Sequence, residues 1–504
     1  MPTRTRWMAA LFVALATLGL AMAQNDRLIL GATSEVSGFD PRIATDVPSF
    51  TVINVMLEPL VAFDQGLGLQ PRLATAWTFS DDGLTLSFDL RQGVTWHDGV
   101  PFTSADVRHT YETTLDPEFG APNRSLYVAI ESIETPDDHT VVFHLSTPTA
   151  FLINNMARMP IVPVHADVDG ALNQRPIGTG PYVFESQARD DRTVLRRNDA
   201  YWGGAGSLAY VEFRIIPENA TRLLAFEAGE IDATQGQLPP LDLPRIEADP
   251  NFVLERTQGT GYTYLGFNTQ VEPLNDVRVR QALNHLIPRD GIVQRVLNGN
   301  GFPGISMILP TMPWFNPDVR QYPYDPERAR GLLQDAGVDF SQPLRLYTND
   351  NAVRVQIAEI LNFEFGQIGL ELQITIEEFG AFLSRVQNTD DFDMFILGWG
   401  GQLDPDRATI RQFHSGAPGS ANYTFYANPT VDALLDEATV TDPTSDRSIE
   451  LYREIQRIVV EESPYAFINY TEETALYHPW VGGWGVHPYS PNTFQDAHLI
   501  TKNR

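Results

Sequence analysis

The chain has 504 residues, which is too long for a single hydrophobic core, so two or three domains are expected. Hydrophobic residues make up 43% and charged residues 20% of the sequence, as in an ordinary globular protein rather than a disordered one. The formal net charge is −29, from 64 acidic and 35 basic residues. A nucleic-acid partner requires clustered Lys and Arg against its phosphates, so this charge argues against nucleic-acid binding.

The N-terminus has the pattern of a targeting segment. Arg4 and Arg6 precede an apolar run from Trp7 to Leu20, and the run ends in the small-x-small pattern Ala21-Met22-Ala23. The run is shorter than the roughly 20 residues that span a bilayer. We therefore expect a cleaved signal peptide over residues 1–23 and an exported mature protein.

The sequence contains no cysteine. Disulfides and thiolate chemistry are therefore unavailable, although exported proteins often carry disulfides. A lipid anchor on a cysteine after the signal is unavailable for the same reason. We expect a free periplasmic protein.

The first part of the chain has mixed α and β patterns. Thr103 followed by Asp106 has the pattern of a helix N-cap. Three strands are predicted from apolar runs or alternation: Arg27 to Gly31, Leu84 to Leu90, and Val141 to Leu145.

Strands and helices alternate in the second part, as they do in βαβ units. Asn275 or Asp276 is expected to cap one helix, and Asp325-Pro326 opens another. A buried strand at Met394 to Leu397 leads into a loop with Gly398, Trp399, Gly400 and Gly401. Ligands of α/β proteins bind beyond the carboxyl ends of strands, so we expect this loop to form part of a ligand site.

The sequence gives little support for a catalytic site. The triplet Gly178-Thr179-Gly180 lacks a Walker lysine, and Gly299, Gly301 and Gly304 follow a helical pattern instead of a strand. The 10 histidines lack zinc spacing, and the Asp pairs sit at predicted turns. Aromatic residues are abundant, with 28 Phe, 17 Tyr and 8 Trp, and an aromatic-lined crevice suits a small-molecule or peptide site.

Several stretches together resemble one family, the bacterial extracellular solute-binding proteins of family 5, which serve peptide-type ABC importers. The stretches are spread in family order over the mature chain: residues 73–107, PIGTGPY (176–182), RRNDAYW (196–202), residues 266–290, LGWGGQLDPD (397–406) and PWVGG (479–483).

The resemblance implies an α/β, two-lobed periplasmic-binding-protein fold of the large, cluster C type, with an extra subdomain in the first lobe. The chain is expected to cross between lobes near 264–268 and to return near 470–479. The expected parts are lobe I (24–58, 172–265 and 478–504), the extra subdomain (59–171) and lobe II (266–477). The resemblance also implies a monomer that closes on a ligand and docks on ABC permease subunits. We expect no cofactor and no metal.

The resemblance also implies ligand-binding residues. In peptide-binding members, an Asp three residues after the Trp of the Gly-Trp loop holds the α-ammonium group of the ligand, whereas this chain has Gln402 there. A neutral amide forms no ion pair, so a sugar, an opine-like compound or a blocked peptide is an alternative to a peptide with a free amine. Asp404 could substitute, but its Asp-Pro setting favours a structural turn. The full expected set is Glu35, Val36, Ser37, Trp399, Gly400, Gly401, Gln402, Asp404, Asn422 and Tyr470.

Two other functions remain as alternatives. A secreted hydrolase could use Asp404 or Asp406 with a second carboxylate, and it would consume its ligand instead of retaining it. A metal-chelate or haem carrier is the other, although the scattered histidines speak against it.

Overall fold

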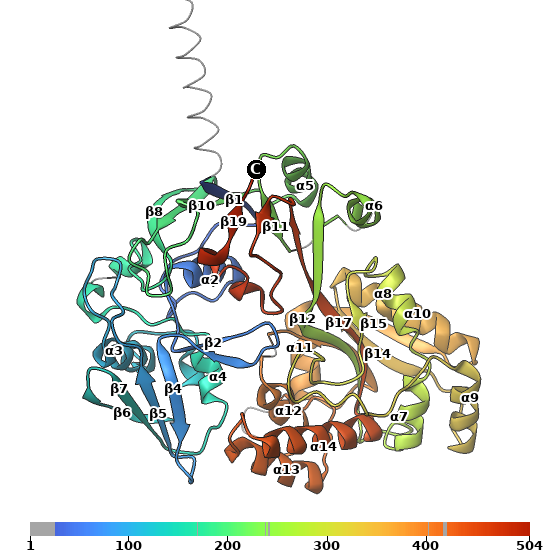
Figure 1. Ribbon diagram of the computed structural model, residues 1–504. Helices are drawn as coiled ribbons and strands as arrows, with labels where there is room; N and C mark the ends of the chain where they lie inside the picture. The colour runs from blue at the N-terminus through green and yellow to red at the C-terminus, as the bar shows by residue number, and fades with distance from the viewer. Residues whose placement is uncertain (1–25, 169, 237, 240–241, 402, 417–420) are drawn as a thin grey trace, which may run out of the picture.

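The computed structural model describes residues 26–168, 170–236, 238–239, 242–401, 403–416 and 421–504. The expected signal peptide lies outside the described residues. An 11-stranded sheet runs through the molecule, and two lobes form around its two halves (Figure 1). The predicted α/β, two-lobed fold is thus confirmed. The strands of the 11-stranded sheet lie in the spatial order β15-β14-β16-β12-β17-β11-β1-β10-β9-β8, and β13 pairs with β17.

The first lobe is built on parallel strands. β1 pairs in parallel with β10, from Arg27 opposite Tyr210 to Ala32 opposite Ile215, and β11 is parallel to β1 on its other side. Helix α2 begins at an N-cap, Asp46, whose side chain accepts a hydrogen bond from the Ser49 amide. The elements of this lobe are β1 (Arg27–Ala32), α2 (Val47–Met56), β8 (Tyr182–Ala188), β9 (Arg192–Arg197), β10 (Tyr210–Ile215), α5 (Asn219–Glu227), β11 (Ala233–Gln235), α6 (Leu243–Ala248), β18 (Val481–Gly482), η5 (Ser490–Asn492), η6 (Ala497–Leu499) and β19 (Thr501–Lys502).

A smaller antiparallel sheet, in the order β4-β5-β7-β6, forms the core of residues 59–171. Leu86 and Phe88 of β5 face inward while their neighbours are more exposed, as the alternation predicts. Thr103 and Asp106 form the predicted capping box of α3. The elements are β2 (Val61–Phe63), β3 (Leu69–Pro71), β4 (Ala74–Phe79), β5 (Thr85–Leu90), α3 (Ser104–Leu115), η1 (Arg124–Leu126), β6 (Ile130–Asp137), β7 (Thr140–Leu145), α4 (Leu152–Met156), η2 (Val164–Ala166) and η3 (Ala171–Asn173).

The second lobe alternates strands and helices. Asp276 and Asp325 cap α7 and α9 through their side chains, as the sequence predicts. The elements are α7 (Val277–Asn284), α8 (Arg289–Arg295), β13 (Phe302–Pro303), α9 (Pro326–Asp335), β14 (Leu344–Asn349), α10 (Ala352–Gln367), β15 (Leu372–Glu377), α11 (Phe379–Asn388), β16 (Met394–Trp399), α12 (Pro405–Phe413), α13 (Pro429–Val440) and α14 (Asp446–Glu462).

Two long strands join the lobes: β12 (Val253–Phe267) and β17 (Tyr465–Tyr477). The start of β12 pairs with the end of β17 next to β11, whereas its end, from Tyr262 on, also pairs with β16 of the second lobe. The register between β12 and β17 breaks between Gln258 and Tyr262. By this pairing the sheet passes from one lobe to the other around residues 259–261, a few residues before the expected 264–268, and around residues 470–472, within the expected 470–479.

The subdomain and the second lobe share one hydrophobic core. Phe151, beside α4, makes edge-on ring contacts with Trp314 and with Tyr452 of α14, each with centroids 5.7 Å apart. The subdomain therefore packs against the second lobe.

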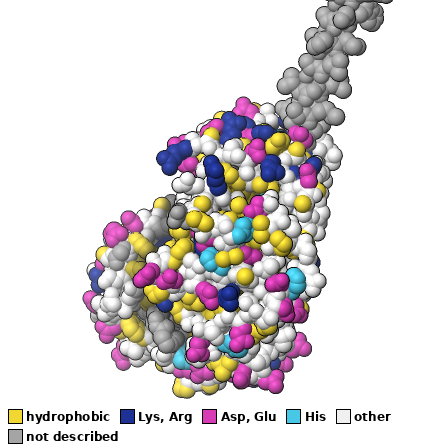
Figure 2. All heavy atoms as spheres, turned by 90° about the vertical axis from the view of Figure 1, so that its left-hand side faces the viewer, with side chains coloured by type: hydrophobic (Ala, Val, Ile, Leu, Met, Phe, Trp, Pro, Cys, Tyr) yellow, Lys and Arg dark blue, Asp and Glu magenta, His cyan; other side chains and the backbone are white. Residues whose placement is uncertain are grey.

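Within the described residues, no helix is both long and apolar enough to cross a membrane. On the face drawn in Figure 2, Arg side chains gather toward the top, at the height of β8 to β10, and Asp and Glu side chains are spread over the whole face.

Candidate functional site

The carboxyl ends of the parallel strands in both lobes point toward the crossing. β11 runs antiparallel to β17, with Gln235 at its carboxyl end opposite Ala475, nearer the second lobe than Ala233 opposite Tyr477. β16 runs antiparallel to β12 and ends with Trp399 opposite Tyr262, beside the register break. Because ligands of α/β folds bind beyond such ends, the space between the two sets of loops is the candidate ligand site.

The structure confirms the buried strand at Met394 to Leu397, but β16 continues through Gly398 and Trp399, so the loop begins at Gly400, two residues later than predicted. The half-buried Trp399 ring stacks on Tyr423, with centroids 6.0 Å apart and planes at 28°. Gly400 has open space around its Cα, and Gly401 has a φ of 64°, which favours glycine. Gln402 lies outside the described residues, so its expected role stays a prediction.

A group of buried polar atoms lies beneath this loop. The Tyr264 and Tyr465 rings stack with centroids 3.9 Å apart. Their hydroxyls and the Trp399 Nε1 are buried, and the Tyr465 hydroxyl lies near the other two groups. Burial raises the pKa of both tyrosines.

Asp404 is buried and directly precedes Pro405, the first residue of α12. That position agrees with the structural role the sequence favours. Burial, followed by the neighbouring charge of Asp404, raises the pKa of Asp406 to about 7.

The first-lobe loop after β1 contributes Glu35, Val36 and Ser37. Ser37 Oγ donates to Asp46 at 2.5 Å, and its backbone N–H donates to Ser49 Oγ at 3.0 Å, so this side chain anchors the loop to the start of α2. Glu35 accepts a hydrogen bond from Gln187 at 3.4 Å. Val36 lines a pocket, described below.

The structure places the last two expected residues in supporting positions. The Tyr470 side chain is buried, and its hydroxyl accepts from the Ile305 and Ser306 amides and donates to the Ser306 carbonyl oxygen. The Asn422 side chain donates to the Tyr426 carbonyl oxygen at 2.6 Å and accepts from the Tyr426 amide. Both side chains thus form hydrogen bonds to backbone groups, and their expected place in the cleft stays a prediction.

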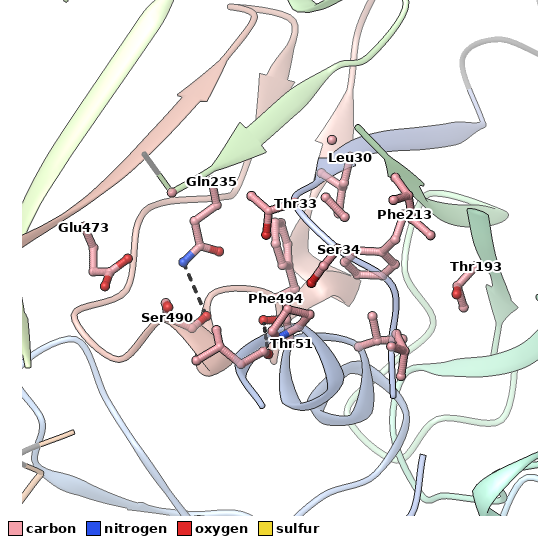
Figure 3. Close-up of a pocket in the computed structure, with 18 residues that line it drawn as sticks. Leu30, Thr33, Ser34, Thr51, Thr193, Phe213, Gln235, Glu473, Ser490 and Phe494 are labelled. Carbon is pink, nitrogen blue, oxygen red and sulfur yellow. Dashed lines mark hydrogen bonds between the residues drawn. The ribbon is translucent and has the colours of Figure 1, made fainter. Parts of the chain in front are cut away.

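A pocket of about 730 Å³, open to solvent, lies at the carboxyl ends of the first-lobe strands. Figure 3 shows Phe213 and Phe494 in its wall, with Gln235, Glu473 and Ser490 on the opposite side. The Gln235 side chain donates to the Ser490 carbonyl oxygen at 3.4 Å. These residues were not predicted from the sequence, because seven separate segments contribute to the pocket.

Arg354, near the start of α10, is a second missed residue. Its Nη1 donates to Asn349 Oδ1 at 2.8 Å, and its Nη2 lies 3.2 Å from where a Cβ on Gly398 would be. Burial lowers its pKa, and no carboxylate among the described residues pairs with it. A single Arg without a motif gives no signal in the sequence.

The described residues contain no group of three or more His, Asp or Glu side chains that could hold a metal ion.

The fold thus has two lobes whose strand ends and loops face each other across the crossing. Residues 68–421 match the family model for "Bacterial extracellular solute-binding proteins, family 5 Middle", and the chain belongs to this family.

Three relatives illustrate the family. The dipeptide-binding protein of Escherichia coli is 28% identical over 95% of this chain and 96% of its own length. Heme-binding protein A of Haemophilus influenzae is 28% identical, covering 94% of this chain and 92% of its own. The oligopeptide-binding protein AppA of Bacillus subtilis, solved with a nonapeptide, has a TM-score of 0.69 and 26% identity over 95% of this chain and 99% of that one.

Proposed function

We propose that this protein is the exported substrate-binding component of an ABC importer, and that it captures a peptide or a related small solute between its lobes. The observation that carries the proposal is the convergence of Trp399 and Gln235, at strand ends of opposite lobes, on the same crossing. The dipeptide-binding and oligopeptide-binding relatives support a peptide-type ligand.

In the proposed complex, backbone groups of the 35–37 loop and of Gly400 and Gly401 bind the main chain of the ligand. Trp399 offers an aromatic surface. Arg354 offers a guanidinium for an acidic group, since a buried cation gains from a carboxylate partner.

Transport requires a cycle of opening and closure. The ligand stabilises the closed form, which a permease in the membrane then recognises. Gly259 and Gly261 lie at the register break of β12, where a Cβ would be 2.6 Å and 3.2 Å from Thr471 Oγ1, so this crossing tolerates only small residues. We propose that the hinge is here, and that the protein acts as a periplasmic monomer without catalysis.

The test is a titration of ligand-free mature protein with di- to pentapeptides. Calorimetry measures binding, and small-angle X-ray scattering measures the radius of gyration. We expect saturable 1:1 binding, a smaller radius of gyration in the complex, and recovery of the peptide intact. Hydrolysis of the peptide would replace this proposal with the hydrolase alternative. Binding only of blocked peptides or sugars would keep the transport role and assign the non-peptide ligand class.

A further inference from the structure

Glu473 is the only ionisable residue that lines the first-lobe pocket among the described residues. It lies on β17, opposite Thr257 of β12, where the sheet passes between the lobes. Burial raises its pKa to about 7, a hydrogen bond from Ser490 partly offsets this, and the charge of Glu472 adds to it. Glu473 is therefore a half-buried carboxyl group that lines a pocket.

The nearby cations among the described residues are engaged elsewhere. Arg256 pairs with Glu472 at 2.8 Å, and because side chains alternate along a strand, Glu472 points to the opposite face from Glu473. On β9 and β10, Thr193 and Phe213 face the pocket, while Arg192 and Arg214 alternate to the other face and contact Glu212. No cation of the described residues forms an ion pair with Glu473.

The positive end of α2 also borders the pocket, at Val47 and Pro48. An unoccupied helix N-terminus would favour an anion. Here the Asp46 carboxylate occupies it, accepting from the Ser49 amide at 2.8 Å. The electrostatic balance of the pocket is therefore negative.

The rest of the wall suits an apolar chain. Phe213 and Phe494 meet edge to face with centroids 5.7 Å apart, and Leu30 lies beside them (Figure 3). Hydroxyl and amide groups of Thr51, Ser34 and Gln235 lie among these apolar groups. An apolar body with one charged end matches this arrangement.

We propose that this pocket binds an ammonium or guanidinium group carried on an apolar chain, with Glu473 as its counter-ion. A Lys or Arg side chain of a peptide ligand has this chemistry, and so has a free organic cation. The assignment to a peptide side chain rests on the proposed function, whereas the preference for a cation rests on the pocket alone.

The first experiment measures the pocket without a peptide. n-Pentylguanidinium and its neutral isostere n-pentylurea are titrated into wild type, Glu473→Gln and the control Glu472→Gln. We expect wild type and the control to prefer the cation about tenfold or more, since charged hydrogen bonds contribute that much, and Glu473→Gln to lose the preference. Equal affinity of wild type for both probes, or a preference that survives in Glu473→Gln, overturns the proposal.

The second experiment distinguishes the sources of the cation. The tripeptides Ala-Arg-Ala and Ala-citrulline-Ala are titrated into the same three proteins. Tighter binding of the Arg peptide, lost in Glu473→Gln, assigns the pocket to a peptide side chain. If only n-pentylguanidinium binds, the pocket proposal holds for a free cation and the peptide function fails. If both peptides bind equally and n-pentylguanidinium does not bind, the pocket proposal fails and the peptide function holds.

A folding control accompanies both experiments. Removing a half-buried charge without an ion-pair partner leaves ligand-free Glu473→Gln at least as heat-stable as wild type at pH 8, measured by calorimetry. A lower melting temperature at that pH would mean that the carboxylate serves the fold, which also contradicts the proposal.

Discussion

Trp399 stacks on Tyr423 at a ring distance of 6.0 Å, which fixes the indole at the point where β16 enters the Gly-rich loop. The aromatic surface is thus held by a contact within the second lobe and needs no ligand to orient it.

Replacing Trp399 with Ala is expected to weaken ligand binding about tenfold or more, because an aromatic anchor in a site carries a large share of the binding free energy. The fold is retained, since the ring is only half-buried. Calorimetric titration measures the first effect and circular dichroism the second. The matched control Tyr423→Phe keeps the stacked ring and loses only the hydrogen bond from Gln387, so its affinity stays near that of wild type. Unchanged affinity in Trp399→Ala would remove the loop from the site.

Gly400 and Gly401 provide a matched pair that tests the loop conformation. Gly401→Ala forces a Cβ into the left-handed region at φ 64° and is expected to cost about 1 kcal/mol in the free energy of unfolding. Gly400 lacks a positive φ and has no neighbour within 4 Å, so Gly400→Ala changes stability little. Urea unfolding compares the two. Equal stabilities would mean that the loop does not require the left-handed residue.

Asp406 is expected to make the stability of the folded state depend on pH. Its folded-state pKa is about 7, above the ordinary 3.8, because it is buried beside Asp404. The folded state therefore holds a proton that the unfolded state has lost, and this contribution to stability is present below about pH 4 and disappears as the pH rises to 7.

Asp406→Asn removes this contribution. The difference in melting temperature between variant and wild type is expected to rise from pH 4 to 7 and then to level off, measured by calorimetry over that range. A difference that stays constant with pH would show that Asp406 titrates normally.

Lys502, the only lysine in the sequence, is buried in the first lobe. Its Nζ lies 2.8 Å from Asp232 Oδ2, and both side chains are almost inaccessible. Lys502→Met leaves a buried carboxylate without its cation and is expected to cost about 3–5 kcal/mol. Chemical denaturation measures the loss, and the double variant Lys502→Met/Asp232→Asn recovers part of it. A loss below 1 kcal/mol in the free energy of unfolding would show that the Lys502–Asp232 ion pair contributes little to stability.

Much of the fold could be predicted from local sequence. The alternation in β5, the capping box of Thr103 with Asp106, and the Asp276 and Asp325 caps are short-range signals, and the structure confirms each of them. The lengths of β12 and β17 could not be predicted. Their central parts, RTQGTG and TEE, are polar or Gly-rich, and they form strands only because each pairs with the other.

The candidate site was less accessible to sequence reasoning. The strand pattern predicts that Trp399 and the glycines belong to the site. Nothing in the local sequence shows that the Tyr470 hydroxyl accepts hydrogen bonds from the backbone amides of residues 305 and 306. Glu473 and Arg354 are ordinary charged residues in the sequence. Their surroundings depend on pairing between segments far apart in the chain, such as Glu473 with Ser490 and Gln235 in one pocket.

Native mass spectrometry of the purified mature protein, followed by denaturation and identification of the released molecule, tests the central claim most directly. We expect one intact small solute of peptide type per chain, with occupancy lost in Trp399→Ala. Release of hydrolysis products, or a solute whose occupancy Trp399→Ala leaves unchanged, would contradict a binding protein that holds its ligand at the Gly-Trp loop.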